Sequence, residues 1–364
     1  MKGLRALLVS SALAGATISG SAVACSIQPV SAIEENGGSI PAPPAEVARI
    51  ESMLPSGFVG EAWVGVGPRI HKAGYDDICD RAVWPWASIT KQIVATLVMQ
   101  QVDAGRIVLD APVGTYLALP AAGDTPMPTV RQLLQHRAGL RNPEDTPADS
   151  AGIPAFYKED EEGSAWCLAE RIAPPAEGFR YNNCDYILLG ALLEQVAGQP
   201  VARQIADLLA PLGPNTAYLA TRKPRGIVGT KQAPIPLDIS RYGAAGAMVG
   251  PLSEIAYFNR ALMDGNLLTD EARAEMWTGD PALGYMALGQ WVFEAALSGC
   301  ASTVRIVERR GQILNYQLRN FILPDLGKSL VVGAREPGFE FGEIWSGTGT
   351  AHDLLSVLAC EEHT

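Results

Sequence analysis

The order of strand-like and helix-like segments is the feature that most restricts the fold. Residues 58–67 (FVGEAWVGVG), and several segments between 284 and 336, have the glycine-bounded, β-branched and aromatic character of strands. Residues 89–105 (ITKQIVATLVMQQVDAG) have the length and apolar density of a buried helix, which Gly105 stops. Between these parts, residues from about 112 to 240 mix short helices with proline-rich turns.

This order predicts an α+β fold in which an antiparallel sheet, flanked by helices, is assembled from both ends of the chain. The segment of about 112–240 is expected to form a mainly helical lobe inserted in it, and residues 351–362 to form a last helix. We therefore expect one large domain over residues 46–364. A cleft between sheet and lobe is the place where a site is expected.

The first 24 residues predict a secretory signal peptide. They carry Lys2 and Arg5, then a mostly apolar run, then the small-residue pattern Ala22-Val23-Ala24 before the expected cleavage point. The run is too short and too rich in Ser and Gly to indicate a membrane span. Residues 25–45 are rich in Pro, Gly and Ser and have no helical or strand period, so we expect a flexible linker.

Cys25 directly follows the expected cleavage point and resembles the acceptor cysteine of a bacterial lipoprotein signal, although Ala22 stands where Leu is usual. Two interpretations stay open. The protein is either tethered to a membrane through lipidated Cys25 or exported without a tether, and in both cases it is periplasmic or in the cell envelope.

Charge argues against nucleic acid as a partner. The chain has a net charge of −11, and loss of residues 1–24 removes Lys2 and Arg5, so that −11 minus 2 gives −13. The remaining basic residues are scattered, whereas phosphate binding needs Lys/Arg patches. The expected partner is a small-molecule or peptide substrate.

Metal and cofactor chemistry are also disfavoured, because Cys and His lack the spacing of a ligand set. The other cysteines are irregularly spaced: Cys79, Cys167, Cys184, Cys300 and Cys360. The same holds for the histidines: His71, His136, His352 and His363. We predict no metal and no cofactor. One or two disulfides are possible in an exported chain, but their pairing is open.

Ser88 and Lys91 stand three positions apart at the start of the apolar helix expected at 89–105. Residues three apart lie on one face of a helix, so their side chains can meet. A serine needs a neighbouring base to become a nucleophile, and a lysine can be that base when burial keeps it neutral part of the time. The alternative is two ordinary polar residues at a helix start.

A second pair of polar residues could join them. Tyr181 and Asn183 lie in a polar loop before an apolar, helix-like run. Tyr257 and Asn259 have the same spacing, but they lie within the amphipathic pattern PLSEIAYFNRALMDG, where a core tyrosine on a helix is the better interpretation. We therefore choose Tyr181.

These segments, in this order, resemble the serine β-lactamase and penicillin-binding fold family, in its class C β-lactamase, DD-peptidase and esterase branch. The resemblance covers roughly residues 50–335. The segments that carry it are SITK (88–91), DAGRIVLDAPVGTYL (103–117), LLQHRAGL (133–140), FRYNNCDYILLG (179–190) and GAAGAMVGPLSEIAYF (243–258). Ser-x-x-Lys with partner motifs is known for such enzymes.

The resemblance implies a role for each residue. Ser88 would be the nucleophile and Lys91 its base, while Tyr181 would relay a proton to the leaving group. Asn183 would donate a hydrogen bond to the bound acyl group and to Lys91. The oxyanion would be held by the backbone amides of Ser88 and Gln312.

The sequence departs from the family at the third motif, which is usually Lys or His, then Thr or Ser, then Gly. Here it reads Arg309-Arg310-Gly311. On a strand, Arg309 and Gly311 would face the cleft and Arg310 the other side. Arginine cannot take part in proton transfer, but its planar fork suits a substrate carboxylate. The alternative is that both arginines are solvated strand residues.

Two functions follow from these features. The first is an exported serine hydrolase that acts through an acyl-enzyme on a β-lactam, a D-alanyl peptide or an ester. The second is a catalytically silent binding protein that keeps the fold, since the third motif is altered. An apolar cleft would favour esters, and candidates for its wall are Trp84, Trp86 and Tyr316, for which core packing is the alternative.

Overall fold

The computed structural model describes residues 44–67, 69–72, 82–118, 126–158, 163–169, 174–228 and 235–360. The expected signal peptide, Cys25 and nearly all of the expected linker lie outside the described residues, as does Cys79. The first helix, α1, already begins at Pro44, two residues before the expected start of the domain.

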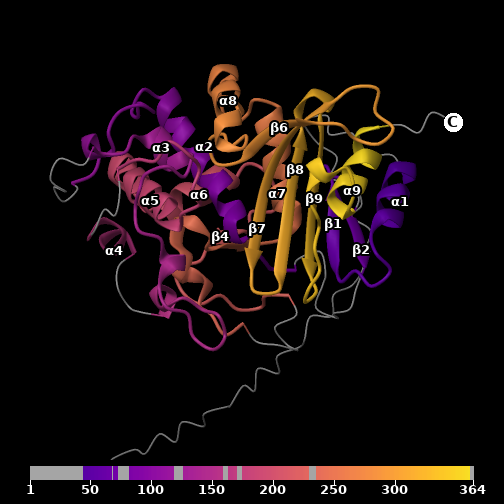
Figure 1. The fold of residues 1–364 in the computed structure, drawn as a ribbon, viewed down its shortest axis with the longest axis horizontal. Coiled ribbons are helices and arrows are strands. Elements are labelled where there is room, and N and C mark those ends of the chain that lie inside the picture. The colour runs from indigo at the N-terminus through magenta and orange to yellow at the C-terminus, as the bar shows by residue number, and fades with distance from the viewer. Residues whose placement is uncertain are drawn as a thin grey trace, which may run out of the picture.

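A six-stranded antiparallel sheet forms the centre of the molecule, with the strand order β2-β1-β9-β8-β7-β6 (Figure 1). Strands from the two ends of the chain therefore lie side by side, as the sequence predicts. The strands are β1 (Gly60–Val64), β2 (Arg69–Lys72), β6 (Trp291–Ala295), β7 (Val304–Ile313), β8 (Tyr316–Leu323) and β9 (Lys328–Arg335).

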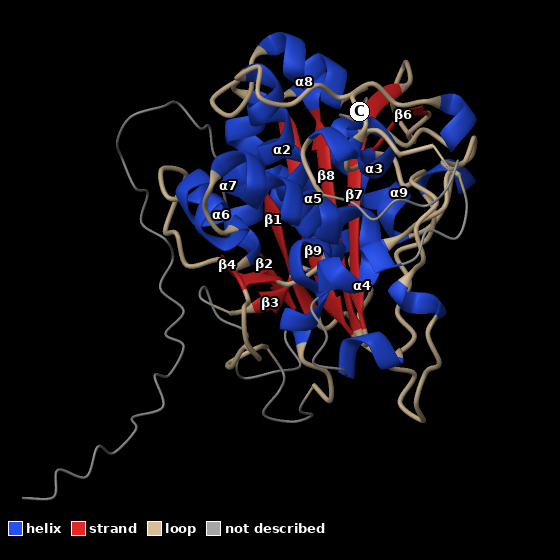
Figure 2. Ribbon diagram, turned by 90° about the vertical axis from the view of Figure 1, so that its left-hand side faces the viewer, coloured by secondary structure: helices blue, strands red, loops and turns tan. Residues whose placement is uncertain are grey.

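Both faces of this sheet are covered, because its strands alternate apolar side chains to each side. Leu330 and Val332 of β9 pack with α1 (Pro44–Met53) and α9 (Thr350–Ala359). Val331 between them belongs to the larger core on the opposite face, together with α7 (Leu252–Met263). The helical lobe stands on that second face, and Figure 2 views the molecule from this side.

Helix α2 (Thr90–Asp103) runs through the larger core, and most of its residues are buried. A helix that is enclosed on nearly all sides places even its polar side chains in a dry environment. The helix ends as predicted, because Gly105 takes a positive φ of 67°, a conformation that glycine adopts at little cost.

The region expected to be a helical lobe contains α3 (Val130–Leu134), α4 (Gly163–Ala169), α5 (Asn183–Ala197) and α6 (Val201–Leu209). A small second sheet has the order β3-β5-β4 and consists of β3 (Trp84–Pro85), β5 (Met248–Gly250) and β4 (Tyr218–Leu219). Helix α8 (Asp270–Met276) follows α7. The order of elements along the chain confirms the predicted α+β arrangement.

Two disulfides are present among the described residues. Cys167 of α4 is bonded to Cys184 in the first turn of α5, and Cys300 is bonded to Cys360 after α9. The first bond fixes the start of α5 to a neighbouring helix. None of the helices in the described ranges is both long and apolar enough to cross a membrane.

Candidate active site

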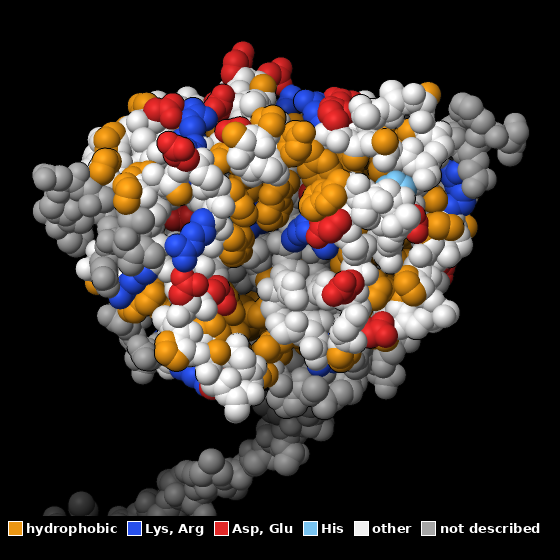
Figure 3. All heavy atoms as spheres, in the orientation of Figure 1, with side chains coloured by type: hydrophobic (Ala, Val, Ile, Leu, Met, Phe, Trp, Pro, Cys, Tyr) orange, Lys and Arg blue, Asp and Glu red, His pale blue; other side chains and the backbone are white. Residues whose placement is uncertain are grey.

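The predicted site residues meet where the helical lobe adjoins the sheet. Ser88 lies in a 3₁₀ turn (Ala87–Ile89) that leads into α2, and Lys91 lies in the first turn of α2. Tyr181 precedes α5, whose first residue is Asn183. Figure 3 shows a hollow between the lobe and the sheet, with hydrophobic side chains along it.

Ser88, Lys91 and Tyr181 form a triangle of mutually hydrogen-bonded groups. The Ser88 hydroxyl shares a short hydrogen bond with the Tyr181 hydroxyl. Lys91 Nζ lies 3.0 Å from Ser88 Oγ and 2.6 Å from Tyr181 Oη. The nucleophile is therefore within direct proton-transfer distance of Lys91, the candidate base, and of Tyr181, the candidate proton relay.

The other contacts of Lys91 determine how its amine is used. Nζ donates to Asn183 Oδ1 and to the backbone oxygen of Ala245, each at 2.7 Å. Both oxygens can only accept, so they take two N–H bonds. The remaining tetrahedral position of Nζ faces the hydroxyls of Ser88 and Tyr181. In a neutral amine, this position carries the lone pair. The arrangement thus suits a lysine that removes a proton from Ser88 or Tyr181.

The electrostatic surroundings favour this neutral form. The Lys91 side chain is fully buried. Burial, and then the nearby positive charge of Arg309, hold the pKa of Lys91 well below its usual value, against the opposing effect of Glu144 and Asp185. A lysine with a lowered pKa is available as a base near neutral pH.

Tyr181 has the opposite property. Burial raises the pKa of its phenol above the usual value, although the charge of Arg309 acts in the other direction. The hydroxyl therefore stays protonated at neutral pH, and it can pass its proton on when Lys91 supplies another.

The orientation of Asn183 is set by neighbours that the sequence did not single out. Its Nδ2 donates to Glu144 Oε1 and lies 2.8 Å from that atom and from Tyr157 Oη. Since a carboxylate can only accept, Nδ2 must face Glu144 and Oδ1 must face Lys91. The expected direction of the Lys91 contact is therefore reversed: Asn183 accepts the bond instead of donating it.

Arg309 lies on β7 and is fully buried, so the interpretation as a solvated strand residue is wrong for this residue. Its Nε donates to the backbone oxygen of Ser88 at 2.8 Å. Nη1 and Nη2 have no hydrogen-bond partner among the described residues. The guanidinium lies 5.3 Å from the Trp291 ring and 5.9 Å from the Tyr181 ring.

Binding of a substrate carboxylate by Arg309 stays a prediction. The two unpaired nitrogens would suit a carboxylate, but the side chain has no exposed surface in this conformation. A ligand would reach it only after a neighbouring side chain moved.

Arg310 points to the opposite face of the sheet, as the alternation along a strand predicts. It is paired with the buried carboxylate of Glu308 and with Glu343, at 2.8 and 2.6 Å. Arg319 binds the same Glu308 at 2.8 Å. Arg310 therefore belongs to an ion-pair network on the face of the sheet that points away from Ser88.

Gly311 is required by close packing of β7 against the turn of Ser88. A Cβ atom at this position would come within 2.3 Å of the backbone oxygen of Trp86. Any side chain would push the strand away, so the expectation that Gly311 keeps the backbone open is consistent with this packing.

The backbone of Gln312 follows on the free edge of β7. Strand β6 pairs with β7 only up to Glu308. The pair Ile313–Tyr316 closes a two-residue hairpin and is hydrogen-bonded, so by alternation the pair Gln312–Gln317 is not. The Gln312 N–H therefore points to the edge that β6 leaves open. This orientation is consistent with the expected role as oxyanion donor, which stays a prediction.

Trp84, Trp86 and Tyr316 do not line the cleft, so core packing is the correct interpretation for them. All three are buried, and Trp84 packs edge-to-face on Tyr316 with ring centroids 6.3 Å apart. The aromatic residues near the site are others. Phe179 packs on Trp291 with ring centroids 6.0 Å apart, and the Trp291 ring lies 5.3 Å from the Arg309 guanidinium.

The rejected tyrosine, Tyr257, lies on α7 and is partly buried against Gly213, without contact to Ser88. Sequence reasoning missed Glu144 and Tyr157, since no local signal marks a residue that contacts Asn183 from another loop. It also left His136 unassigned, although this histidine stands inside the quoted segment LLQHRAGL.

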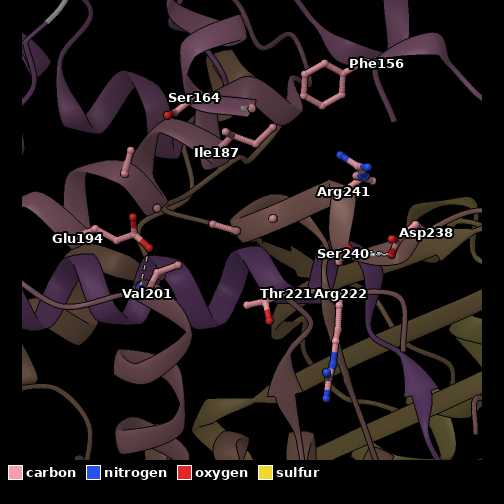
Figure 4. A pocket seen from close by; sticks show the side chains of 15 residues that line it. Phe156, Ser164, Ile187, Glu194, Val201, Thr221, Arg222, Asp238, Ser240 and Arg241 are labelled. Carbon is pink, nitrogen blue, oxygen red and sulfur yellow. Dashed lines mark hydrogen bonds between the residues drawn. The ribbon is translucent and has the colours of Figure 1, made fainter. Parts of the chain in front are cut away.

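A cavity of about 560 Å³ lies behind the site, between α4, α5 and the 3₁₀ segment Ile239–Ala245 (Figure 4). Glu194, Arg222 and Arg241 contribute to its lining, and Ala244 separates it from the oxygen that binds Lys91. Ser88 is not part of this cavity. Within the described ranges, no group of three or more Cys, His, Asp or Glu residues could hold a metal ion.

Comparison with known proteins agrees with this geometry. Residues 57–289, more than half of the chain, match the family model described as Beta-lactamase. The esterase EstB of Burkholderia gladioli is 32% identical over 38% of each chain. The putative penicillin-binding protein PbpX of Bacillus subtilis (strain 168) is 25% identical over 52% of this chain and 49% of its own. The match thus spans half or less of these relatives.

The fold is also similar to a solved structure. The D-amino acid amidase from Ochrobactrum anthropi SV3, in complex with D-phenylalanine, has a TM-score of 0.67 and 21% identity, over 86% of this chain and 98% of its own. The family match, together with an esterase and a penicillin-binding protein among the relatives, supports hydrolase activity in the broad sense. By its match over residues 57–289, the chain belongs to the Beta-lactamase family.

Proposed function

We propose that this protein is an exported serine hydrolase that forms an acyl-enzyme at Ser88. The observation that carries the proposal is the hydrogen-bonded triangle of Ser88, Lys91 and Tyr181. Two N–H bonds of Lys91 are held by carbonyl oxygens, so the lone pair of its neutral form is directed at the nucleophile.

In the first step, Ser88 Oγ attacks the substrate carbonyl carbon while its proton passes to Lys91, directly or through Tyr181. The electron pair of the C=O bond moves to oxygen. The backbone N–H groups of Ser88 and Gln312 then stabilise the resulting oxyanion, and removal of one such donor typically lowers the rate about 10²- to 10³-fold.

The tetrahedral intermediate collapses when the bond to the leaving group breaks. Tyr181 donates its proton to the leaving nitrogen or oxygen and is reprotonated by Lys91, so the proton taken from Ser88 ends on the product. A water molecule then attacks the acyl carbonyl carbon. Water takes the place of Ser88 as the nucleophile, and Ser88 takes the place of the leaving group. This step restores the Ser88 hydroxyl and releases the acid.

The substrate class is a β-lactam, a D-alanyl peptide or an ester. All three contain a carbonyl that Ser88 could attack, and the names of the relatives include an esterase, penicillin-binding proteins and amidases. The Phe179–Trp291 pair offers an apolar contact for a substrate side chain. The unpaired nitrogens of Arg309 would suit a carboxylate if Trp291 moved aside.

Export is proposed from residues 1–24, and the two disulfides support it. Disulfides such as Cys167–Cys184 form and persist in oxidising compartments. Membrane tethering through Cys25 is the second part of this proposal. Mass spectrometry of the mature N-terminus from a membrane fraction distinguishes lipidated Cys25 from an untethered chain.

The test of the proposed function is covalent labelling with a fluorophosphonate and with a fluorescent penicillin, followed by mass mapping of the modified residue. Label on Ser88 is expected, with no label in Ser88→Ala and full label in the exposed control Ser52→Ala. Ser88→Ala should leave the thermal midpoint nearly unchanged. Label on a different serine would contradict the assignment.

The altered third motif keeps the silent binding protein as the second candidate. Its specific support is that Arg309 is buried and cannot act as a base. A parent protein that binds penicillin reversibly without forming a covalent adduct would favour this candidate.

A further inference from the structure

A buried pair of ionisable side chains lies directly behind Tyr181 and is not used by the proposed mechanism. His136 and Asp185 are both fully buried, and His136 Nδ1 lies 3.3 Å from Asp185 Oδ2. Asp185 is in the first turn of α5. His136 follows α3 and has a positive φ of 58°, which is uncommon for a residue other than glycine.

His136 holds the chain on both sides of Tyr181. Its backbone oxygen accepts a hydrogen bond from the N–H of Arg180 at 3.0 Å. Its Nδ1 accepts one from the N–H of Asn182 at 3.3 Å. The imidazole also packs against the Tyr181 ring, with centroids 4.6 Å apart. A change at His136 therefore acts on the position of Tyr181.

The same contacts determine the protonation states of His136 and Asp185. The Asn182 N–H can only donate, so Nδ1 must present its lone pair, and the imidazole is then neutral with its proton on Nε2. An ionised Asp185 has only lone pairs and could not bond to that nitrogen. A protonated Asp185 can, because its O–H donates to Nδ1, and the single lone pair of Nδ1 is then shared by two donors that each lie 3.3 Å away.

The burial of Asp185 and His136 also favours the neutral form of both side chains. Asp185 Oδ1 and His136 Nε2 have no hydrogen-bond partner among the described residues, and an isolated charge in such a place is very costly. Burial raises the pKa of Asp185 well above its usual value, with the charge of Lys91 opposing. Burial, Arg309 and Lys91 lower the pKa of His136.

We infer that His136 and protonated Asp185 form a net-neutral, hydrogen-bonded pair, and that this pair is a positioning element that holds Tyr181 between Ser88 and Lys91. The inference rests on the proposed function only for its effect on rate. Neutrality also matters for Lys91, because a negative charge on Asp185 would favour the protonated, inactive form of the lysine.

The first test is independent of activity. Infrared spectra of the whole protein at neutral pH are compared for the parent, Asp185→Asn and the surface control Asp149→Asn. The carbonyl stretch of a protonated carboxylic acid is expected in the parent and in Asp149→Asn, and it should be lost in Asp185→Asn. Its survival in Asp185→Asn would overturn the protonated assignment.

The second test follows Tyr181 itself in protein with ¹³C-labelled tyrosine. His136→Leu should shift the Tyr181 resonance, which is assigned by its loss in Tyr181→Phe. His136→Gln, whose side-chain oxygen can still accept from the Asn182 N–H, should restore it in part. His352→Gln, a change at another buried histidine on α9, serves as the control. An unmoved Tyr181 resonance in His136→Leu would overturn the positioning role.

The third test measures the rate of fluorophosphonate labelling of Ser88. His136→Leu is expected to lower this rate about 10- to 100-fold, the scale associated with small misplacements of a reacting group. His136→Gln and Asp185→Asn should recover much of the rate that His136→Leu and Asp185→Leu lose. Equal losses in the conservative and the apolar variants would contradict the pair. If the parent is not labelled, the proposed function fails, while the spectroscopic tests still decide this inference.

Discussion

Arg309 and Arg310 are neighbours on β7, yet they lie in opposite electrostatic surroundings. Arg310 is paired with two carboxylates, Glu308 and Glu343, and their hydrogen bonds and charges raise its pKa despite partial burial. Arg309 contacts no carboxylate in the described part of the chain. It donates to a backbone oxygen and lies close enough to Lys91 to lower the pKa of that lysine.

The comparison shows how one strand serves two purposes. A cation whose charge is matched by carboxylates has little effect on its other neighbours, and loss of one partner would leave a buried charge uncompensated. An unmatched buried cation affects the titratable groups near it, and here those groups include Lys91, Tyr181, Tyr186 and His136. The face of β7 toward Ser88 therefore carries the charge that the proposed chemistry would use, and the other face carries an ion-pair network.

The largest effect on activity is expected at Lys91, which lies near Arg309. Lys91→Arg keeps a cation but cannot supply a neutral amine, so kcat/KM should fall about 10²- to 10⁴-fold, nearly as far as in Lys91→Ala. The measurement is turnover of an ester that the parent hydrolyses. Near-parent activity in Lys91→Arg would mean that Lys91 acts only through its charge.

Tyr181→Phe removes the hydroxyl that bonds to both Ser88 and Lys91, and kcat is expected to fall about 10²-fold. Tyr257→Phe is the matched control, because it removes a hydroxyl from a tyrosine on α7. This control should retain the parent rate. The reverse pattern would show that the wrong tyrosine was assigned.

Arg309→Ala tests the difference between the two arginines through the pH dependence of kcat/KM. Removal of this cation should raise the pKa of Lys91 toward its usual value, and Lys91 must be neutral to act as base. The acidic limb of the kcat/KM profile is therefore expected to move to higher pH. At neutral pH the loss should be roughly tenfold to a hundredfold, the scale of a charged hydrogen bond. An unmoved limb would remove Arg309 from the control of Lys91.

The substrate can separate this effect from carboxylate binding. If Arg309 binds a substrate carboxylate, Arg309→Ala should weaken hydrolysis of an acid more than that of its methyl ester, and Arg310→Ala should not discriminate between them. If Arg309 acts only on Lys91, both substrates should lose activity equally. The measurement is kcat/KM for the two substrates in both variants.

The smallest effect is expected at the ion pair between Arg310 and Glu343. Glu343→Gln removes one ion pair of Arg310, and because the Glu343 side chain is 41% exposed, the loss of unfolding free energy should be at most about 1 kcal/mol. Arg310 lowers the pKa of Glu343, so the pair stabilises above the usual carboxyl pKa and loses its effect as the pH falls. Urea unfolding at several pH values should show the difference shrinking in acid, with labelling of Ser88 unchanged.

The sequence predicts local features of this molecule well. The helix at 89–105 and the strands after residue 290 have patterns set by their own residues. Helix α2 ends within two residues of the predicted bounds, and β7, β8 and β9 lie inside the predicted strand-like region of 284–336. Tyr181 could be separated from Tyr257 because a polar loop and an amphipathic helix differ in local pattern. Helix spacing brought Ser88 and Lys91 together, whereas the placement of Asn183 beside them came from the resemblance, which carries three-dimensional information that spacing lacks.

The features that sequence could not provide depend on contacts between distant parts of the chain. The direction of the Asn183 amide is fixed by Glu144, on a separate loop. For Trp84 and Tyr316 the sequence left a cleft wall and core packing as alternatives, because aromatic composition indicates burial but not location. The contact of Arg309 with Trp291, on the neighbouring strand β6, is also a contact between residues distant in sequence. Pairing of the disulfides is likewise a property of the folded chain.

The position of β1 between β2 and β9 has a consequence for biosynthesis. Gly60 of β1 pairs with Ala334 of β9, so the central sheet cannot close until nearly the whole chain has left the ribosome. Contacts of such long sequence separation are slow to form, and the unfinished chain exposes its hydrophobic segments for that time. Ser88 meets its β7 neighbours at the same late stage. A chain that stays open until its last strands are made can still be threaded through a narrow translocation channel, and it becomes a folded protein only afterwards.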